Sequence, residues 1–128
     1  MARILVADDD TSSLDVMTVA LTAEGHEVLC ASNGQDAVET ALVEQPDLVF
    51  LDVMMPVMDG YEACEQLRND PDIPRSLPII FLTSIEPDVK TLEKVGATGH
   101  LPKRHMVAEL RDLLAEHLGP EARGAGRE

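Results

Sequence analysis

Apolar residues along the chain form five short, nearly uninterrupted runs, and between these runs apolar positions recur every three or four residues. Short apolar runs are typical of parallel strands that are buried on both faces, whereas the wider spacing is typical of amphipathic helices. We therefore expect strands at 3–7, 27–31, 48–51, 78–83 and 98–101. Because strands and helices alternate, right-handed crossovers should place the helices on both faces of one parallel sheet.

Capping and helix-breaking residues predict where the helices begin and end. Helices are expected at about 12–24, 35–44, 59–69, 87–95 and 106–118. Ser12 or a neighbour should cap the first helix, and Asp59 with Glu62 has the spacing of a capping box at the third. Gly96 suits the end of the fourth helix, which is expected to be short.

The last helix sets the expected end of the domain. Gly119 and Pro120 should end this helix, so residues 1–119 would form one domain and residues 120–128 a flexible tail. The inward face of the helix is predicted to consist of Val107, Leu110, Leu113, Leu114 and Leu118. The favoured fold class is α/β and flavodoxin-like, with a doubly wound, five-stranded parallel sheet in the order 2-1-3-4-5 and five helices.

Acidic residues stand where two of the strands end. Asp8, Asp9 and Asp10 follow the first strand, and Asp52 follows the third. These strands flank the switch point of the predicted sheet, where ligands bind in such folds. Crowded carboxylates repel one another, so they need a cation or hold protons at a raised pKa, and Mg²⁺ suits oxygen ligands with open water positions. The alternative that these acids only cap helices explains Asp10 and Asp59 but explains Asp52 poorly.

Two further strand ends supply complementary groups. Thr83 and Ser84 follow the fourth strand, and Lys103 follows the fifth. Together with the acids they offer a carboxylate nucleophile, a metal, a hydroxyl donor and an ammonium group. These are the groups that stabilise a phosphoryl group during transfer, so the set predicts phosphoryl chemistry.

Charge narrows the possible partners. The formal net charge of −14 repels phosphate backbones and anionic lipids, so we expect no direct nucleic-acid binding and no membrane association.

No apolar stretch reaches membrane-spanning length and no signal-peptide layout is present, which predicts a cytoplasmic location. Basic residues concentrate in 90–111, which is either an ordinary solvated surface or a docking patch for an acidic partner. Cys30 and Cys64 are expected to be buried free thiols.

From residue 3 to about residue 118, the chain resembles the receiver domain of two-component response regulators. The matching motifs are Ile4-Leu5-Val6-Ala7-Asp8-Asp9-Asp10, Leu51-Asp52-Val53-Met54-Met55-Pro56-Val57-Met58-Asp59-Gly60, Phe81-Leu82-Thr83-Ser84 and Leu101-Pro102-Lys103. The combination of these motifs in this order is highly specific.

The resemblance implies a stand-alone signalling switch in a phosphorelay, which would catalyse only its own phosphotransfer and slow autodephosphorylation. Asp52 would accept a phosphoryl group from a phosphohistidine on a sensor histidine kinase or a histidine phosphotransfer protein. Lys103 would pair with the phosphate, and Thr83 would hydrogen-bond it. The implied Mg²⁺ ligands are Asp8, Asp9, Asp52 and the backbone carbonyl of Met54. A downstream protein would bind the surface formed by 87–111.

The chain departs from the family pattern at several positions. By this resemblance, Thr83 would move toward the phosphate, and an aromatic side chain usually fills the space that it leaves. His100 stands at the position of that aromatic residue, so it is either a smaller, chargeable switch residue or an ordinary surface histidine. Arg104 stands where a proline usually follows the lysine, so the cis peptide usual there would be missing or strained. Ser84, Met54 and Ile85 would lie beside the phosphate. Because Met54 and Ile85 are apolar, they should hinder an attacking water and slow the loss of the phosphoryl group.

Two other functions fit parts of the sequence. An aspartate-nucleophile phosphohydrolase of the haloacid dehalogenase type would use Asp8 and Asp10, which have its D-x-D spacing. That function normally needs a longer chain and leaves Asp52 without a role. A receiver-like binding module that is never phosphorylated would use the fold only as a docking surface, but it would not need Asp52, Thr83 and Lys103.

Overall fold

The structure is a computed structural model that describes residues 1–125. Its five parallel strands form one sheet in the order β2-β1-β3-β4-β5, which confirms the predicted flavodoxin-like topology. The strands are β1 (Arg3–Ala7), β2 (Glu27–Ala31), β3 (Leu48–Asp52), β4 (Ile79–Thr83) and β5 (Gly99–Pro102). The helices are α1 (Thr11–Ala23), α2 (Gly34–Glu44), α3 (Gly60–Asn69), α4 (Val89–Val95) and α5 (Met106–Ala125), with a 3₁₀ turn, η1 (Lys103–His105), before α5.

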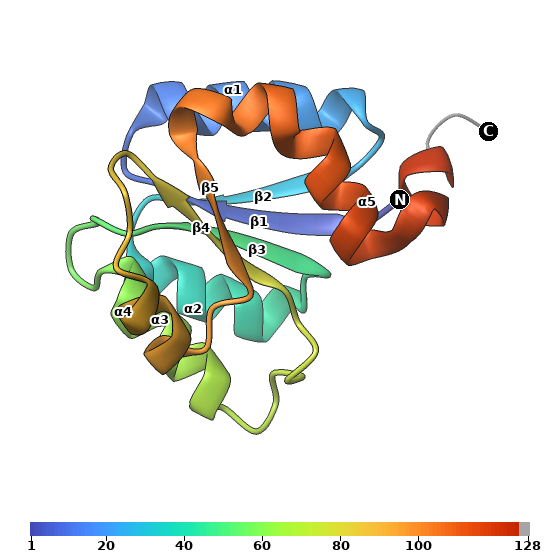
Figure 1. The fold of residues 1–128 in the computed structure, drawn as a ribbon. Coiled ribbons are helices and arrows are strands. Elements are labelled where there is room, and N and C mark those ends of the chain that lie inside the picture. Colours follow the sequence, from blue (N-terminus) through green and yellow to red (C-terminus); the bar gives the residue numbers. More distant parts are fainter. Residues whose placement is uncertain (126–128) are drawn as a thin grey trace.

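Two apolar layers hold the sheet between its helices. Figure 1 shows α1 and α5 over one face of the sheet and α2, α3 and α4 over the other. Successive strand residues alternate between the layers, so that Leu5 and Val49 belong to the α2–α4 layer and Ile4 and Phe50 to the α1–α5 layer. All four side chains are fully buried, because the central strands are covered on both faces.

Side-chain caps fix the starts of the helices. Asp10 caps α1 by accepting a hydrogen bond from the Ser12 backbone N–H (2.9 Å), so the predicted cap is a neighbour of Ser12. Asp59 caps α3 by accepting from the Glu62 N–H (2.9 Å), as the capping-box spacing predicts. The fourth helix, α4, has only seven residues and ends at Gly96, as expected for a short helix.

Two side chains that were predicted to be buried are exposed. Val107 is 63% exposed, because the inward stripe of α5 runs through Met106, Leu110 and Leu114 and the next residue lies about 100° round the helix from it. Cys30 is exposed because β2 is an edge strand that is only partly covered on the α1 side, where the Cys30 Sγ lies 3.7 Å from the Thr18 Oγ1. Cys64 is buried, as predicted.

The last helix has a kink at Gly119, where the sequence predicts its end. Gly119 has φ 83° and ψ 159°, which is not helical, but helical backbone resumes after it and continues to Ala125. The flexibility of residues 120–128 stays a prediction, and residues 126–128 lie outside the described part of the chain. Neither α5 nor any other helix within residues 1–125 combines the length and the apolar character needed to cross a membrane.

Two glycines hold the loop that follows β3 close to the sheet. A Cβ on Gly34 would lie 2.1 Å from the Met58 backbone oxygen, and a Cβ on Gly60 would lie 2.2 Å from the Asp52 backbone oxygen. The Gly34 N–H donates to the Met58 carbonyl (2.9 Å), and the Gly60 N–H donates to the Val53 carbonyl (2.9 Å). The absence of side chains at these two positions therefore lets the loop pack against the end of β3.

Val57, within this loop, adopts a left-handed backbone conformation with φ 69°. Its side chain is 82% exposed, and the Met58 N–H donates across it to the Pro56 carbonyl (2.7 Å). A β-branched residue in this conformation costs roughly 1–3 kcal/mol, which glycine avoids. We expect Val57→Gly to increase the free energy of unfolding by about 1 kcal/mol in urea titrations, after allowing for the greater freedom of glycine in the unfolded chain.

Val43 provides the matched control for this substitution, since it is equally exposed but lies in the helix α2. Val43→Gly should decrease the free energy of unfolding, because glycine is a poor residue inside a helix. A decrease of similar size in both variants would show that Val57 is not strained.

Candidate functional site

The carboxylates that end β1 and β3 lie side by side at one edge of the sheet. The strand register pairs Ala7 with Leu51, so the residues that follow them, Asp8 and Asp52, are neighbours. Asp8 is fully buried and Asp52 is 7% exposed, whereas Asp9 is exposed. One carboxylate oxygen from each of these three aspartates lies within 4.8 Å of the others. The structure therefore brings together the three acids that the sequence predicts as metal ligands.

Lys103 reaches this acidic cluster from the edge strand β5. It follows β5, which is separated from β3 by β4. Its Nζ lies 2.7 Å from the Asp8 Oδ2 and 3.4 Å from the Asp52 Oδ2. The other Asp8 oxygen accepts a hydrogen bond from the Asp10 N–H (2.9 Å). One ammonium group thus bridges two carboxylates that would otherwise repel each other.

The cluster retains an excess of negative charge. Burial and the neighbouring Asp8 raise the pKa of Asp52 from 3.8 to about 6, although Lys103 acts in the opposite direction. Burial lowers the pKa of Lys103, but its contacts with Asp8 and Asp52 outweigh burial and leave that pKa raised. Three carboxylates against one ammonium suit a hard divalent cation, and oxygen ligands of this kind fit Mg²⁺.

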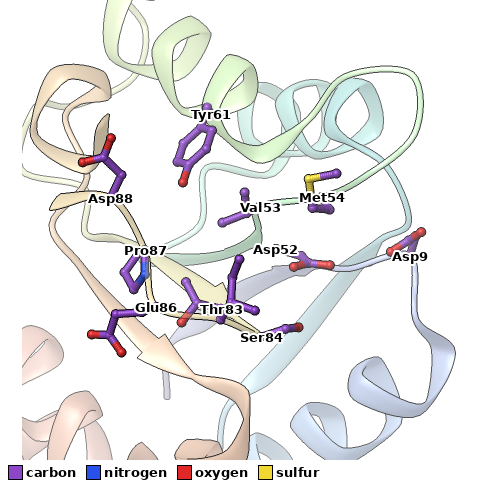
Figure 2. Close-up of a pocket in the computed structure, with 11 residues that line it drawn as sticks. Asp9, Asp52, Val53, Met54, Tyr61, Thr83, Ser84, Glu86, Pro87 and Asp88 are labelled. Atoms are coloured by element: carbon purple, nitrogen blue, oxygen red, sulfur yellow. The ribbon is translucent and has the colours of Figure 1, made fainter. Parts of the chain in front are cut away.

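A cavity of about 510 Å³ opens beside Asp52 (Figure 2). Its lining includes Thr83, whose hydroxyl oxygen is buried and has no hydrogen-bond partner among the described residues. A buried hydroxyl of this kind can donate a hydrogen bond to a group that enters the cavity. Two apolar side chains, Met54 (75% exposed) and Ile85 (80% exposed), line the cavity at its exposed edge. Ser84 also lines the cavity.

Tyr61 is a cavity residue that the sequence did not reveal. Its ring packs against Phe81 with a centroid separation of 5.3 Å, and Figure 2 shows its hydroxyl group pointing into the cavity. Burial raises the pKa of this hydroxyl, with smaller contributions from Asp88 and Asp59. The available signal was its position in the first turn of α3, directly after the Asp59-Gly60 pair.

The remaining candidates lie outside the acidic cluster. His100 is exposed on β5 and lines a different cavity together with Glu109 and Glu116. Asp10 uses its carboxylate to cap α1, so the second acid of the D-x-D spacing is not directed at phosphoryl chemistry. The peptide bond between Lys103 and Arg104 is trans, as are the other peptide bonds of the described residues. Of the two outcomes expected there, a missing or a strained cis peptide, the structure has the first.

Comparison with known proteins identifies a family for the chain. The family model described as "Response regulator receiver domain" matches residues 4–115. A probable transcriptional regulator, ycf27, of Pyropia yezoensis is 39% identical over 118 residues, which cover 88% of this chain and 47% of that protein. The chain therefore spans about half the length of this curated relative.

Solved structures agree with the family match. The chemotaxis protein CheY4 of Vibrio cholerae is 32% identical with a TM-score of 0.83, and the alignment covers 91% of this chain and 98% of that one. The receiver domain of a sensor histidine kinase from Pseudomonas aeruginosa is 29% identical with a TM-score of 0.83, covering 92% and 98% of the two chains. That receiver domain was crystallised with a magnesium ion coordinated in its active-site cleft.

Proposed function

The chain belongs to the response regulator receiver domain family, and on this premise we propose that Asp52 accepts a phosphoryl group from the phosphohistidine of a sensor histidine kinase or a phosphotransfer protein. Members of this family are signalling switches of two-component systems and not enzymes with turnover. The observation that carries the proposal is the position of Asp52 at the cavity, with the Lys103 ammonium 3.4 Å from one of its oxygens. The cytoplasmic location expected from the sequence goes with this proposal.

The groups around Asp52 have complementary roles in the transfer. An ionised Asp52 oxygen attacks the phosphorus, the P–N bond breaks, and its electron pair returns to the imidazole of the donor. Lys103 neutralises charge that develops on the phosphoryl oxygens, and Thr83 donates its unused hydroxyl proton to one of them. Asp8, Asp9, Asp52 and the Met54 carbonyl would hold Mg²⁺, which supplies further charge neutralisation when bound.

Phosphorylation of Asp52 would change the surface formed by 87–111 by moving residues that line the cavity. Movement of Thr83 toward the phosphoryl group would draw the loop that precedes α4 with it, since Ser84 and Asp88 line the same cavity. We expect a downstream protein to bind the surface formed by 87–111, where exposed Lys90 and Arg104 are available to an acidic partner. His100 is exposed on this surface, so its roles as a switch residue and as an ordinary surface histidine both stay open to test.

Mass spectrometry after incubation with acetyl phosphate and Mg²⁺ tests the proposal. A receiver gives a stable phosphoryl adduct on Asp52, a phosphohydrolase releases phosphate through Asp8, and a module that is never phosphorylated gives no change. Tyr61 is the single tyrosine in a chain without tryptophan and lines the cavity. Its fluorescence therefore provides a second, independent signal, which should change as the adduct forms.

Two apolar side chains at the edge of the cavity, Met54 and Ile85, should make the phosphorylated state long-lived. Met54 and Ile85 have no group that could orient an attacking water, and both line the cavity at its exposed edge. We expect Met54→Asn and Ile85→Glu each to shorten the half-life of phosphorylated Asp52 by roughly threefold to thirtyfold, which is less than the roughly 100-fold or more of full general acid–base catalysis because these side chains are expected mainly to orient the water. The half-life is measured by following the adduct mass after the phosphodonor is removed.

Val89→Glu is the control for charge and polarity near the site, because Val89 is exposed but does not line the cavity. This variant should keep the wild-type half-life. Unchanged half-lives in both Met54→Asn and Ile85→Glu would contradict the role assigned to these two apolar side chains.

A further inference from the structure

A second cavity, of about 360 Å³, lies between the carboxyl-terminal ends of α3 and α4, and we call it the α3–α4 cavity. It is lined by Glu65, Arg68, Asn69, Arg75, Lys94, Val95 and Gly96. Three of the ten basic residues of the chain thus meet at one cavity with a single carboxylate, although the net charge of the chain is −14. Such a concentration of positive charge favours an anionic ligand.

Arg68 is the fixed cation of the α3–α4 cavity. Its Nε donates to the Gly96 carbonyl (2.8 Å), and its two terminal nitrogens donate to the Arg75 carbonyl (3.3 Å) and the Thr98 hydroxyl (3.2 Å). These three acceptors are neutral, and Arg68 forms no ion pair with any side chain of residues 1–119, the part of the chain whose side chains the structure describes. A guanidinium has five N–H donors, so two remain available for another group.

Burial lowers the pKa of Arg68, because its charge is partly removed from water. An anion in the α3–α4 cavity would supply the missing counter-charge. Arg75 and Lys94, whose side chains are exposed, can turn toward the same anion at little cost. The Glu65 carboxylate would repel the anion, so removal of its charge should tighten binding.

The α3–α4 cavity is separate from the phosphorylation site. Tyr61, in the first turn of α3, lines the cavity beside Asp52, whereas Arg68 lies about 10 Å further along the same helix. Similarly, Asp88 at the start of α4 lines the first cavity and Gly96 at its end lines the second. Figure 1 shows α3 and α4 side by side on the same face of the sheet.

We propose that the α3–α4 cavity binds a phosphate group, either as inorganic phosphate or as part of a small phosphomonoester. The planar forks of Arg68 and Arg75 match the oxygens of phosphate, and Lys94 adds a third positive charge. The volume of about 360 Å³ lies at the small end of the range for ligand cavities. This site does not depend on phosphorylation of Asp52.

Titration of the ¹⁵N-labelled protein in the absence of Mg²⁺ tests the proposal, with sodium chloride added to hold the ionic strength constant. Inorganic phosphate should shift the amide signals of 68–75 and 94–98 in a saturable manner, with a dissociation constant of about 1 mM or below. Arg75→Ala and Lys94→Ala should each weaken binding roughly fivefold or more. Glu65→Gln should tighten binding, since it removes the one opposing charge. All three variants alter exposed side chains, so the fold should be preserved.

Lys90→Ala is the matched control, because Lys90 is an exposed lysine of the same helix and does not line the α3–α4 cavity. It should leave the affinity for phosphate unchanged. An equal loss in Lys90→Ala and Lys94→Ala, or the absence of saturation by about 10 mM phosphate, would overturn the proposal. A parallel titration with a nucleoside monophosphate separates the two sources, because tighter binding identifies a phosphomonoester and equal or weaker binding identifies inorganic phosphate.

Discussion

The Asp52→Asn variant will take up no phosphoryl group from acetyl phosphate and will be more stable than the wild type at neutral pH. The first effect follows from the loss of the carboxylate nucleophile, because an amide oxygen cannot form the acyl phosphate. The second follows from the electrostatics of the site, where Asp52 is buried beside the fully buried Asp8. Asparagine keeps the shape of the side chain and removes one of the two repelling charges.

The stability effect depends on pH in a defined direction. The pKa of Asp52 is raised from 3.8 to about 6, so the folded state binds this proton more tightly than the unfolded state. The contribution of Asp52 to the free energy of unfolding therefore falls as the pH rises from about 4 to about 6, and it stays low above that range. The asparagine of the variant does not titrate, so the gain in the free energy of unfolding should be about 1–3 kcal/mol at neutral pH and small near pH 4.

Urea titrations at about pH 4.5 and about pH 7.5 without Mg²⁺ measure this difference, and mass spectrometry measures the loss of the adduct. Asp15→Asn is the control, because Asp15 is exposed on α1 and belongs neither to the acidic cluster nor to the lining of the cavity beside Asp52. It should retain both the adduct and the stability of the wild type. A variant at Asp52 that is less stable at the higher pH would mean that attraction to Lys103 outweighs repulsion by Asp8.

The sequence predicted the acidic cluster because a buried parallel sheet restricts where strand ends can lie. Apolar runs fix the strands, the alternation of strands and helices fixes their direction, and the sheet order brings Asp8 and Asp52 together. The same logic placed Thr83 and Lys103 at this edge. The preference of Lys103 for Asp8 (2.7 Å) over Asp52 (3.4 Å) was not predictable, since it depends on how a flexible side chain crosses β4.

Features that depend on helix rotation and loop packing were beyond sequence analysis. Val107 was wrongly assigned to the core, because a shift of one residue in the apolar stripe of α5 turns it outward. The α3–α4 cavity draws Arg68, Arg75 and Lys94 from a helix, a loop and another helix, and no local spacing pattern connects them. Tyr61 was overlooked for a related reason, since its place in the cavity depends on contact with Phe81 of β4.

Lys103→Met should lower the free energy of unfolding at neutral pH by several kcal/mol when Mg²⁺ is absent, and Mg²⁺ should restore much of the loss. Removal of one partner from a buried ion pair typically costs about 3–5 kcal/mol, because it leaves an uncompensated charge. Here the Asp8 carboxylate is fully buried and loses an ammonium at 2.7 Å. Protonation of Asp52 will reduce the cost, so a loss of about 2–4 kcal/mol is expected.

Recovery with Mg²⁺ separates the loss of charge compensation from the loss of packing. A divalent ion on the carboxylates of Asp8, Asp9 and Asp52 supplies the positive charge that methionine lacks, so Mg²⁺ should stabilise the variant more than the wild type. Urea titrations with and without Mg²⁺ measure both effects, and Lys90→Met, which alters an exposed lysine, should behave like the wild type. Equal stabilisation of the variant and the wild type by Mg²⁺ would mean that the ion does not bind the carboxylates that Lys103 neutralises.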